Sequence, residues 1–234
     1  MRRGESHLAS VAAVLDLLPE AREQLVFLGG CVPAFYARPT GAPIRATKDV
    51  DCMSTMSPWV LQEQMLAQLC AFGKLVPVLE TQFRYQVPDT DLVIDVLSPD
   101  GFNTGGGTLW MREAAENSAR HVLPDGRTVR VVTPPYFVLL KLAAFLDRGP
   151  DLISAKDMED LVFMAVEVDD LSGQVHRAGL SPAVEAKWRE VFVQQNIDVE
   201  YLPELVEYHT TDSGRRARAV ATLSALAKGT VAVP

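Results

Sequence analysis

The spacing of apolar residues changes character along the chain. Residues 7–19 carry apolar side chains three or four positions apart, which predicts an amphipathic helix. The continuous apolar run 25–28 predicts a first strand. Short β-forming runs and turns follow, with one helical stretch at 57–72. After Thr133-Pro134-Pro135 every segment has helical spacing. The pattern predicts an α+β protein with a mixed β-sheet and flanking helices in residues 1–133, followed by a C-terminal helical region in 134–234 that packs over it.

The boundaries of the remaining elements follow from the same spacing and from turn residues such as Pro124-Asp125-Gly126. Further strands are predicted at 48–53, 75–79, 83–87 and 92–97, with a hairpin between 122 and 132. Helices of the C-terminal region are predicted at about 135–147, 155–168, 182–194, 200–208 and 212–227.

Two carboxylates follow the first strand at a short spacing. The apolar run enters Gly29-Gly30, and Asp49 and Asp51 then lie two positions apart in the next predicted strand. Side chains alternate along a strand, so both aspartates project from one face. Two carboxylates about 4 Å apart repel by roughly 4 kcal/mol at an effective dielectric constant of about 20. A divalent cation turns this repulsion into attraction, and oxygen ligands suit Mg²⁺ or Mn²⁺.

Asp95 is the one charged residue in the β-forming run 92–97. A buried carboxylate costs free energy unless it is paired or binds a metal. Asp95 is therefore either a ligand of the same metal site or the partner of a basic residue such as Arg84. We favour the metal, because the sheet already holds Asp49 and Asp51. Three carboxylates can hold two ions that promote in-line displacement at a phosphoryl group.

The strand ending in Gly-Gly, the Asp-x-Asp pair and the later carboxylate together resemble the nucleotidyltransferase superfamily. Downstream, Lys141 lies in an apolar helix, and Lys156-Asp157-Met158-Glu159-Asp160-Leu161 follows. With these elements, residues 25–165 resemble the AbiEii/AbiGii-type toxin nucleotidyltransferases, which include MenT-like tRNA-modifying toxins. The resemblance implies a Mg²⁺-dependent enzyme that transfers a nucleoside monophosphate from an NTP to a hydroxyl acceptor. The implied acceptor is a tRNA 3′ end, and the implied protein partner is a cognate antitoxin.

Four residues near the aspartates are predicted to contact the nucleotide. Gly29 and Gly30 lack Cβ atoms, so their N–H groups can approach a phosphate closely, although an ordinary strand-to-helix turn would use the same pair. Thr47 is predicted to share a face with the aspartates and to contact a phosphate or a metal-bound water. Lys48 adds a positive charge beside them, but a lysine at the end of a strand is commonly only solvated.

The downstream charges have two interpretations each. By resemblance, Lys141 is a cation placed over the triphosphate; otherwise its head group reaches water. Arg148, seven residues later, is a second phosphate clamp or a solvated helix end. The resemblance implies that one aspartate orients Lys141 or the nucleotide. We favour Asp160, which precedes the apolar Leu161, over Asp157. An acidic helix N-terminus also forms without any function.

Composition restricts the choice of partner. The chain has 234 residues and a formal net charge of −8, which argues against a broad nucleic-acid surface. Its concentrated positive charges are Arg215, Arg216 and Arg218 near the C-terminus. Two alternatives therefore stay open. One is a nucleotidyltransferase acting on a small molecule of the aminoglycoside type or on a protein side chain. The other is a catalytically inactive nucleotide-binding module.

The predicted location is the cytoplasm, with no membrane partner. Cys31, Cys52 and Cys70 have no zinc-ligand spacing, which is typical of buried thiols in a reducing compartment. The N-terminal segment lacks the features of a signal peptide. The longest apolar stretch, near 131–146, is interrupted by two prolines and Lys141, so it is too short to span a bilayer.

Overall fold

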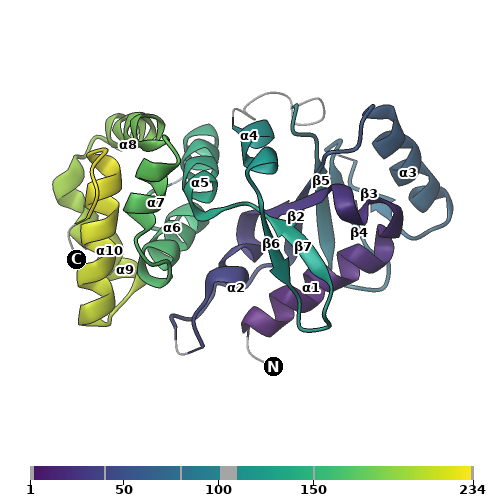
Figure 1. The fold of residues 1–234 in the computed structure, drawn as a ribbon, viewed down its shortest axis with the longest axis horizontal. Helices are drawn as coiled ribbons and strands as arrows, with labels where there is room; N and C mark the ends of the chain where they lie inside the picture. The colour runs from purple at the N-terminus through teal and green to yellow at the C-terminus, as the bar shows by residue number, and fades with distance from the viewer. Residues whose placement is uncertain (1–2, 40, 80, 101–109, 150, 233–234) are drawn as a thin grey trace. The chain divides into compact units, whose positions relative to one another are not determined.

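The structure, a computed structural model, describes residues 3–39, 41–79, 81–100, 110–149 and 151–232. The chain divides into two compact units (Figure 1). The first contains residues 1–35 and 46–133, and the second contains residues 36–45 and 134–234. The sequence pattern groups residues 36–45 with the sheet, whereas the structure assigns them to the helical unit.

The first unit carries all the strands among the described residues. Its elements are α1 (Arg3–Leu17), η1 (Pro19–Gln24), β1 (Leu25–Leu28), η2 (Gly29–Cys31), α2 (Pro33–Tyr36, whose last residue begins the second unit), β2 (Asp49–Ser54), α3 (Val60–Ala71), β3 (Val76–Pro77), β4 (Arg84–Gln86), β5 (Val93–Leu97), α4 (Met111–Glu116), β6 (Ala119–Val122) and β7 (Thr128–Val131).

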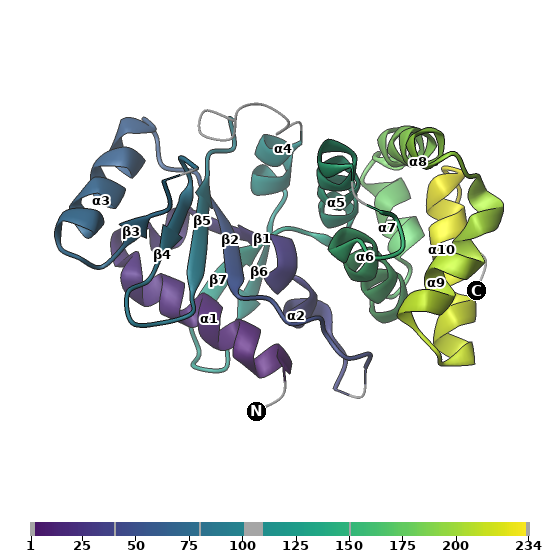
Figure 2. The ribbon, with the colours of Figure 1, turned by 180° about the vertical axis from the view of Figure 1, so that it is seen from behind.

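In the described part of the chain, seven strands form one mixed sheet in the order β3-β4-β5-β2-β1-β7-β6. The pairs β2–β5 and β1–β7 are parallel, and the other neighbours are antiparallel. The prediction of a mixed sheet with flanking helices is confirmed, and Figure 2 shows α1 extending along the sheet. All four residues of β1 are buried, which explains their continuous apolar run.

Several boundaries in the first unit differ from the prediction. α1 spans Arg3–Leu17 and not 7–19, β6 begins at Ala119 and not near 122, and α4 was not predicted. β2 begins at Asp49, so Thr47 and Lys48 precede the strand. β3 is reduced to Val76–Pro77 at the sheet edge. A proline has no N–H group for the ladder, which limits strand pairing there. α3 begins at Val60, later than the sequence suggested, and no side chain caps it.

The second unit is helical. Its elements are α5 (Pro134–Arg148), α6 (Lys156–Glu167), α7 (Leu171–Arg177), α8 (Ser181–Gln195), η3 (Val199–Tyr201), α9 (Leu202–His209) and α10 (Ser213–Ala227). The five predicted helices of this region are present with small shifts at their ends. The sequence did not predict α7, which contains Ser172 and Gly173, two poor helix formers. Its Leu171 and Val175 are buried, so packing stabilises this short helix.

The segment 36–45 is fixed to the helical unit through Glu167, at the end of α6. The backbone N–H groups of Arg38 and Ala42 donate to the Glu167 carboxylate at 3.1 and 2.7 Å. Arg38 Nε also donates to the Glu167 carbonyl oxygen at 3.1 Å. A Cβ atom at Gly41 would overlap the same carboxylate, so the segment approaches Glu167 more closely than a larger residue allows.

None of the helices in the described part of the chain has the length and apolar character needed to cross a bilayer.

Candidate functional site

The three predicted metal ligands lie on two neighbouring strands of the first unit. Asp51 on β2 is the direct partner of Asp95 on the parallel strand β5, so their side chains share one face of the sheet. Asp49 lies two residues before Asp51 on the same face. We call Asp49, Asp51 and Asp95 the carboxylate row. The sequence prediction that these residues share one face of a sheet therefore agrees with the strand register.

A cation stands beside the carboxylate row. Arg84 on β4 is the direct partner of Asp95 across an antiparallel pair. Its Nε and Nη2 atoms donate to the two Asp95 carboxylate oxygens at 2.8 and 2.7 Å. Nη2 also lies 3.7 Å from the nearer oxygen of Asp49. These hydrogen bonds to Asp95 raise the pKa of Arg84 further above its ordinary value, so the guanidinium is a permanent positive charge here.

The sequence left two roles open for Asp95, a metal ligand or the partner of a basic residue. In the structure Asp95 forms an ion pair with Arg84, which is the second role. The side chain of Asp95 is 6 % exposed, so pairing removes the cost of a lone buried carboxylate. As the side chains lie, no group of three His, Cys, Asp or Glu residues within the described ranges is arranged to hold a metal ion. The oxygens of Asp49 and Asp95 converge on Arg84 instead. Metal ligation by the row stays a prediction.

The residue types of the row nevertheless fit a divalent cation. Three carboxylates and one guanidinium carry a formal charge of −3 + 1 = −2. The side chain of Asp49 is 47 % exposed, so the row is accessible to solvent from that side. A carboxylate offers about four lone-pair positions, so Asp95 can accept from Arg84 and still have capacity for an ion. Oxygen-only donors suit Mg²⁺ or Mn²⁺.

Gly29 fits against the carboxylate row from β1. Leu28, the last residue of β1, pairs with Asp51, and Gly29 follows with φ +68°. A Cβ atom at Gly29 would overlap the Asp51 carboxylate. Both the backbone conformation and the lack of space require glycine at this position. Gly30 is buried in the short helix η2.

The structure places Thr47 and Lys48 in local contacts. The Thr47 hydroxyl accepts from the backbone N–H of Asp49 at 3.3 Å, so it stabilises the start of β2. The Thr47 N–H donates to His7 Nε2 at 3.2 Å. Lys48 pairs with Asp91 at 3.3 Å, and both side chains are largely exposed. Lys48 is therefore solvated, which was one of the two possibilities for a lysine at the end of a strand. Contact of Thr47 or Lys48 with a nucleotide stays a prediction.

In the second unit, Lys141 lies in a buried charge cluster formed by Arg45, Lys141, Arg148, Asp157 and Asp160. Lys141 Nζ is 2.7 Å from Asp160 Oδ2 and 3.2 Å from Asp157 Oδ1. Its side chain is 11 % exposed, so the ammonium group does not reach out into water. Nζ also lies 5.5 Å from the centre of the Phe137 ring, close enough for a cation–π interaction.

Both candidate aspartates of α6 face Lys141. Asp157 and Asp160 are 3 % and 2 % exposed and lie three residues apart on one helix face. Both aspartates therefore contact Lys141, and the favoured residue, Asp160, is only the nearer of the two. Burial opposes the ionisation of Asp157, but Lys141 and Arg148 outweigh it and lower the pKa of that carboxyl.

Two arginines complete the buried charge cluster. Arg45 Nε and Nη2 donate to the two Asp160 oxygens at 3.2 and 3.1 Å. Burial opposes the charge on Arg45, yet the hydrogen bond and charge of Asp160 outweigh it and raise the Arg45 pKa. Arg148 is paired with Asp157 and is 60 % exposed. A role of Lys141, Arg148, Asp157 or Asp160 toward a nucleotide stays a prediction.

Sequence reasoning missed Arg45 as the partner of Asp160. Arg45 precedes the aspartates of β2 closely, but 115 residues separate it from Asp160. No local periodicity connects residues so far apart.

Comparison with known proteins adds no relative: no protein-family model matches the chain, and no curated protein matches it.

Proposed function

We propose that the protein is a Mg²⁺-dependent nucleotidyltransferase that transfers a nucleoside monophosphate from an NTP to a hydroxyl group at a tRNA 3′ end. It would act as the toxin of a toxin–antitoxin pair. The observation that carries the proposal is the alignment of Asp51 with Asp95 on adjacent parallel strands, with Asp49 on the same face. A row of like charges is unfavourable for stability alone, which supports a functional reason for it.

In this proposal Asp49, Asp51 and Asp95 hold the metal. Bound Mg²⁺ would supply charge neutralisation for the triphosphate and activation of the acceptor hydroxyl. Asp49, whose side chain is 47 % exposed, presents oxygens toward solvent, where a nucleotide can arrive. Asp95 is fixed by two hydrogen bonds from Arg84, which sets the orientation of its carboxylate before any ligand binds.

Gly29 has a positioning role in the same proposal. The absence of a side chain lets the Asp51 carboxylate lie directly against the backbone at the end of β1. The register of β2 and β5 still makes Asp51 the direct partner of Asp95. Contact of the Gly29 and Gly30 backbone with a phosphate stays part of the proposal.

The direct test is NTP-dependent labelling of RNA. Purified protein is incubated with Mg²⁺, total RNA and each of the four α-³²P-labelled NTPs in turn, beside an Asp51→Asn variant. Asn keeps the shape of Asp but removes the charge that a hard cation requires. Label on tRNA-sized RNA is expected with the wild type and not with Asp51→Asn.

Asp91→Asn is the matched control, because Asp91 is 87 % exposed and pairs with Lys48 outside the carboxylate row. It should label RNA like the wild type. Labelling that persists in Asp51→Asn would contradict the assignment of the row. NTP binding without RNA labelling would instead assign the reaction to a small-molecule or protein acceptor.

A further inference from the structure

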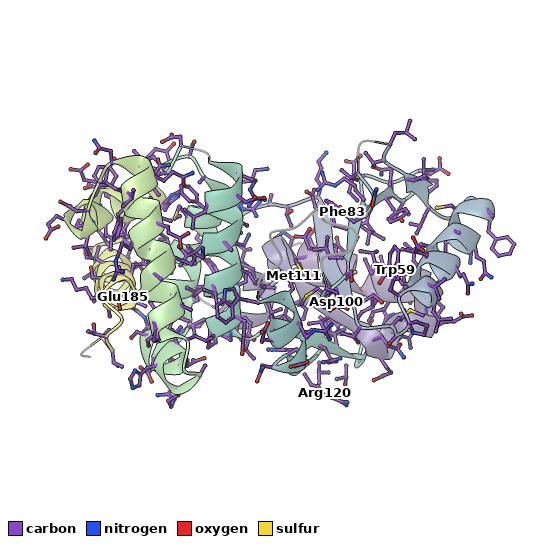
Figure 3. All side chains as sticks on the ribbon, turned by 90° about the horizontal axis from the view of Figure 1, so that it is seen from above. Trp59, Phe83, Asp100, Met111, Arg120 and Glu185 are labelled. Atoms are coloured by element: carbon purple, nitrogen blue, oxygen red, sulfur yellow. The ribbon has the colours of Figure 1, made fainter. Side chains whose placement is uncertain are left out.

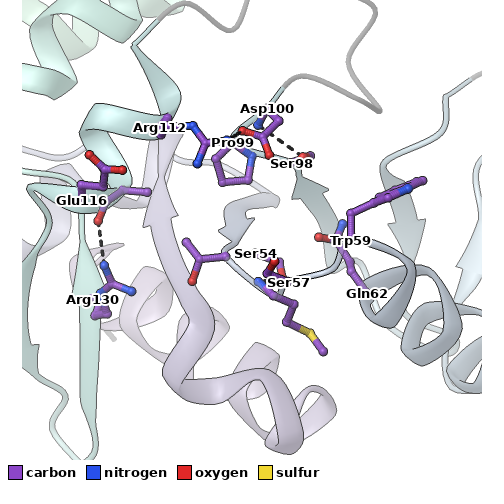
Figure 4. A pocket seen from close by; sticks show the side chains of 13 residues that line it. Ser54, Ser57, Trp59, Gln62, Ser98, Pro99, Asp100, Arg112, Glu116 and Arg130 are labelled. Atoms are coloured by element: carbon purple, nitrogen blue, oxygen red, sulfur yellow. Dashed lines mark hydrogen bonds and ion pairs between the residues drawn. The ribbon is translucent and has the colours of Figure 1, made fainter.

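The first unit contains a second site that the carboxylate row does not use. A cavity of about 560 Å³ lies beyond the carboxyl ends of β2 and β5 (Figure 4). Ser54 and Ser98, three residues after Asp51 and Asp95, line it. Three strand residues span roughly 10 Å, so the cavity is separate from the row. Its volume is in the range of small-molecule sites, which is about 300–1,000 Å³.

A buried side chain in this cavity has an unused hydrogen-bond donor. Gln62 on α3 is 1 % exposed and lines the cavity. Its Nε2 atom has no hydrogen-bond partner among the residues that the structure describes. An unsatisfied buried donor is unfavourable, so a fold rarely retains one without a ligand or water to accept from it. Figure 4 shows the Gln62 side chain beside Trp59, on one side of the cavity.

The charges around the cavity are balanced. Arg112 is paired with Asp100, and Arg130 donates to the carbonyl oxygen of Ala115 at 2.7 Å. With Glu116, the described lining carries two positive and two negative side chains, a formal sum of zero. A triphosphate would find no excess positive charge on these lining residues. The lining therefore favours a neutral ligand.

The remaining walls favour a flat ring. Trp59 supplies an aromatic surface, and Met56 and Pro99 are apolar. Figure 3 shows Trp59 and Asp100 in the same part of the first unit. Aromatic stacking together with an amide group is the combination by which proteins hold unpaired nucleobases. The Gln amide offers a donor and an acceptor, which matches the edge of a base.

We infer that this cavity binds a neutral nucleobase, either of a free nucleoside or of a single-stranded RNA end, stacked at Trp59 and hydrogen-bonded to Gln62. The choice of a nucleobase over other neutral rings rests on the proposed function, in which the acceptor is RNA. Binding itself requires neither the carboxylate row nor Mg²⁺, because a nucleoside has no phosphate.

The test is titration of the full-length protein with adenosine, cytidine, guanosine and uridine, and with a six-residue single-stranded oligoribonucleotide. Isothermal titration calorimetry in EDTA measures the affinity without any metal. Gln62→Leu should weaken binding by about fivefold or more, since one bidentate base contact discriminates by roughly 1–3 kcal/mol. Trp59→Ala should weaken it by about fivefold or more through lost stacking.

Gln64→Leu on the same helix is the matched control, because Gln64 is exposed and lies outside the cavity lining. It should bind like the wild type. Gln62→Leu should also unfold no more easily than the wild type, since it removes an unsatisfied donor. Binding of the oligoribonucleotide but not of nucleosides would assign the cavity to an RNA end.

Absence of binding by both nucleosides and oligoribonucleotide at millimolar concentration overturns the inference, and so does binding that neither Gln62→Leu nor Trp59→Ala weakens. The proposed function fails separately: Asp51→Asn should abolish RNA labelling and leave nucleoside affinity unchanged. Nucleoside binding without labelling would keep the cavity and reject RNA as the acceptor of the transfer reaction.

Discussion

The carboxylate of Asp51 occupies the space that a side chain at Gly29 would need. Gly29 directly follows β1, and Asp51 lies in the adjacent antiparallel strand β2. The left-handed backbone conformation is one reason for a glycine after the first strand, and this contact is a further reason. A residue with a Cβ atom at position 29 would have to displace the carboxylate that is aligned with Asp95.

Gly29→Ala should disrupt the carboxylate row. The left-handed conformation alone costs an alanine about 1–2 kcal/mol, and the overlap with Asp51 adds to it. We expect loss of Mg²⁺-dependent NTP binding together with reduced stability in urea. Gly73→Ala is the matched control, because Gly73 has φ +66° and a methyl group there would meet none of the described residues within 4 Å. Equal losses of stability and NTP binding in both variants would assign the whole effect to backbone strain.

Arg84→Gln should strengthen Mg²⁺ binding to the carboxylate row. A unit charge and a divalent ion about 5 Å apart repel by roughly 1.7 kcal/mol even in bulk water, which corresponds to about tenfold in affinity. Without Mg²⁺ the variant should lose about 1–3 kcal/mol of stability, because Asp95 loses its partner. Calorimetric titration with Mg²⁺ and urea unfolding measure the two effects. Arg120→Gln, at an exposed position of β6, should change neither. Unchanged Mg²⁺ affinity in Arg84→Gln would argue against an ion beside Asp95.

Asp160→Asn should destabilise the helical unit strongly. Asp160 is the shared anion of Arg45 and Lys141, so its loss leaves two cations with unbalanced charge in a buried place. Breaking a buried ion pair costs about 3 kcal/mol or more. Asp147→Asn, on the exposed face of α5, should stay within about 0.5 kcal/mol of the wild type in urea unfolding. Similar stability of the two variants would mean that the buried charge cluster contributes little.

Stability should fall as pH drops below about 6.5. Burial lowers the pKa of His209, and the charge of Asp160 and a hydrogen bond with the backbone of Ile153 only partly oppose this. The unfolded chain therefore binds the proton first, starting near its ordinary pKa of about 6.5, and the folded state loses stability down to the lowered pKa. One such proton changes the free energy of unfolding by at most about 1.4 kcal/mol per pH unit.

His209→Gln should make the free energy of unfolding less dependent on pH between about 7 and 5.5, as measured by urea unfolding at several pH values. Burial also lowers the pKa of His121, so some dependence of the same sign remains. His176→Gln, at an exposed position, should leave the profile unchanged. An identical profile for His209→Gln and the wild type would exclude His209 as a source of the effect.

The parts of the fold that periodicity could predict are those in which local pattern and packing agree. The continuously apolar β1 and the helices α5 and α8 have such patterns, and their positions match the prediction closely. The short helix α7 was missed because Gly173 weakens its local signal. The edge strand β3 was overestimated because the pattern gives little weight to the missing N–H of Pro77.

The site was predictable where residues are close in sequence and not where they are distant. Asp49 and Asp51 share a face because of strand geometry alone. The pairing of Asp95 with Arg84 was among the alternatives, since one turn separates their strands. The attachment of Arg45 to Asp160 and the burial of the Gln62 amide against the cavity depend on tertiary packing, and neither has a local pattern.

The division of the chain has a consequence for how this protein can vary. The backbone passes between the two units after residues 35, 45 and 133, so no single cut separates them. A fragment that starts at Pro134 would keep Asp160 and Glu167 but lose the Arg45 guanidinium and the N–H groups of Arg38 and Ala42 that bind them. Recombination that exchanges the gene segment after codon 133 must therefore preserve residues 36–45 as well. The helical unit therefore forms the same structure only when residues 36–45 accompany residues 134–234.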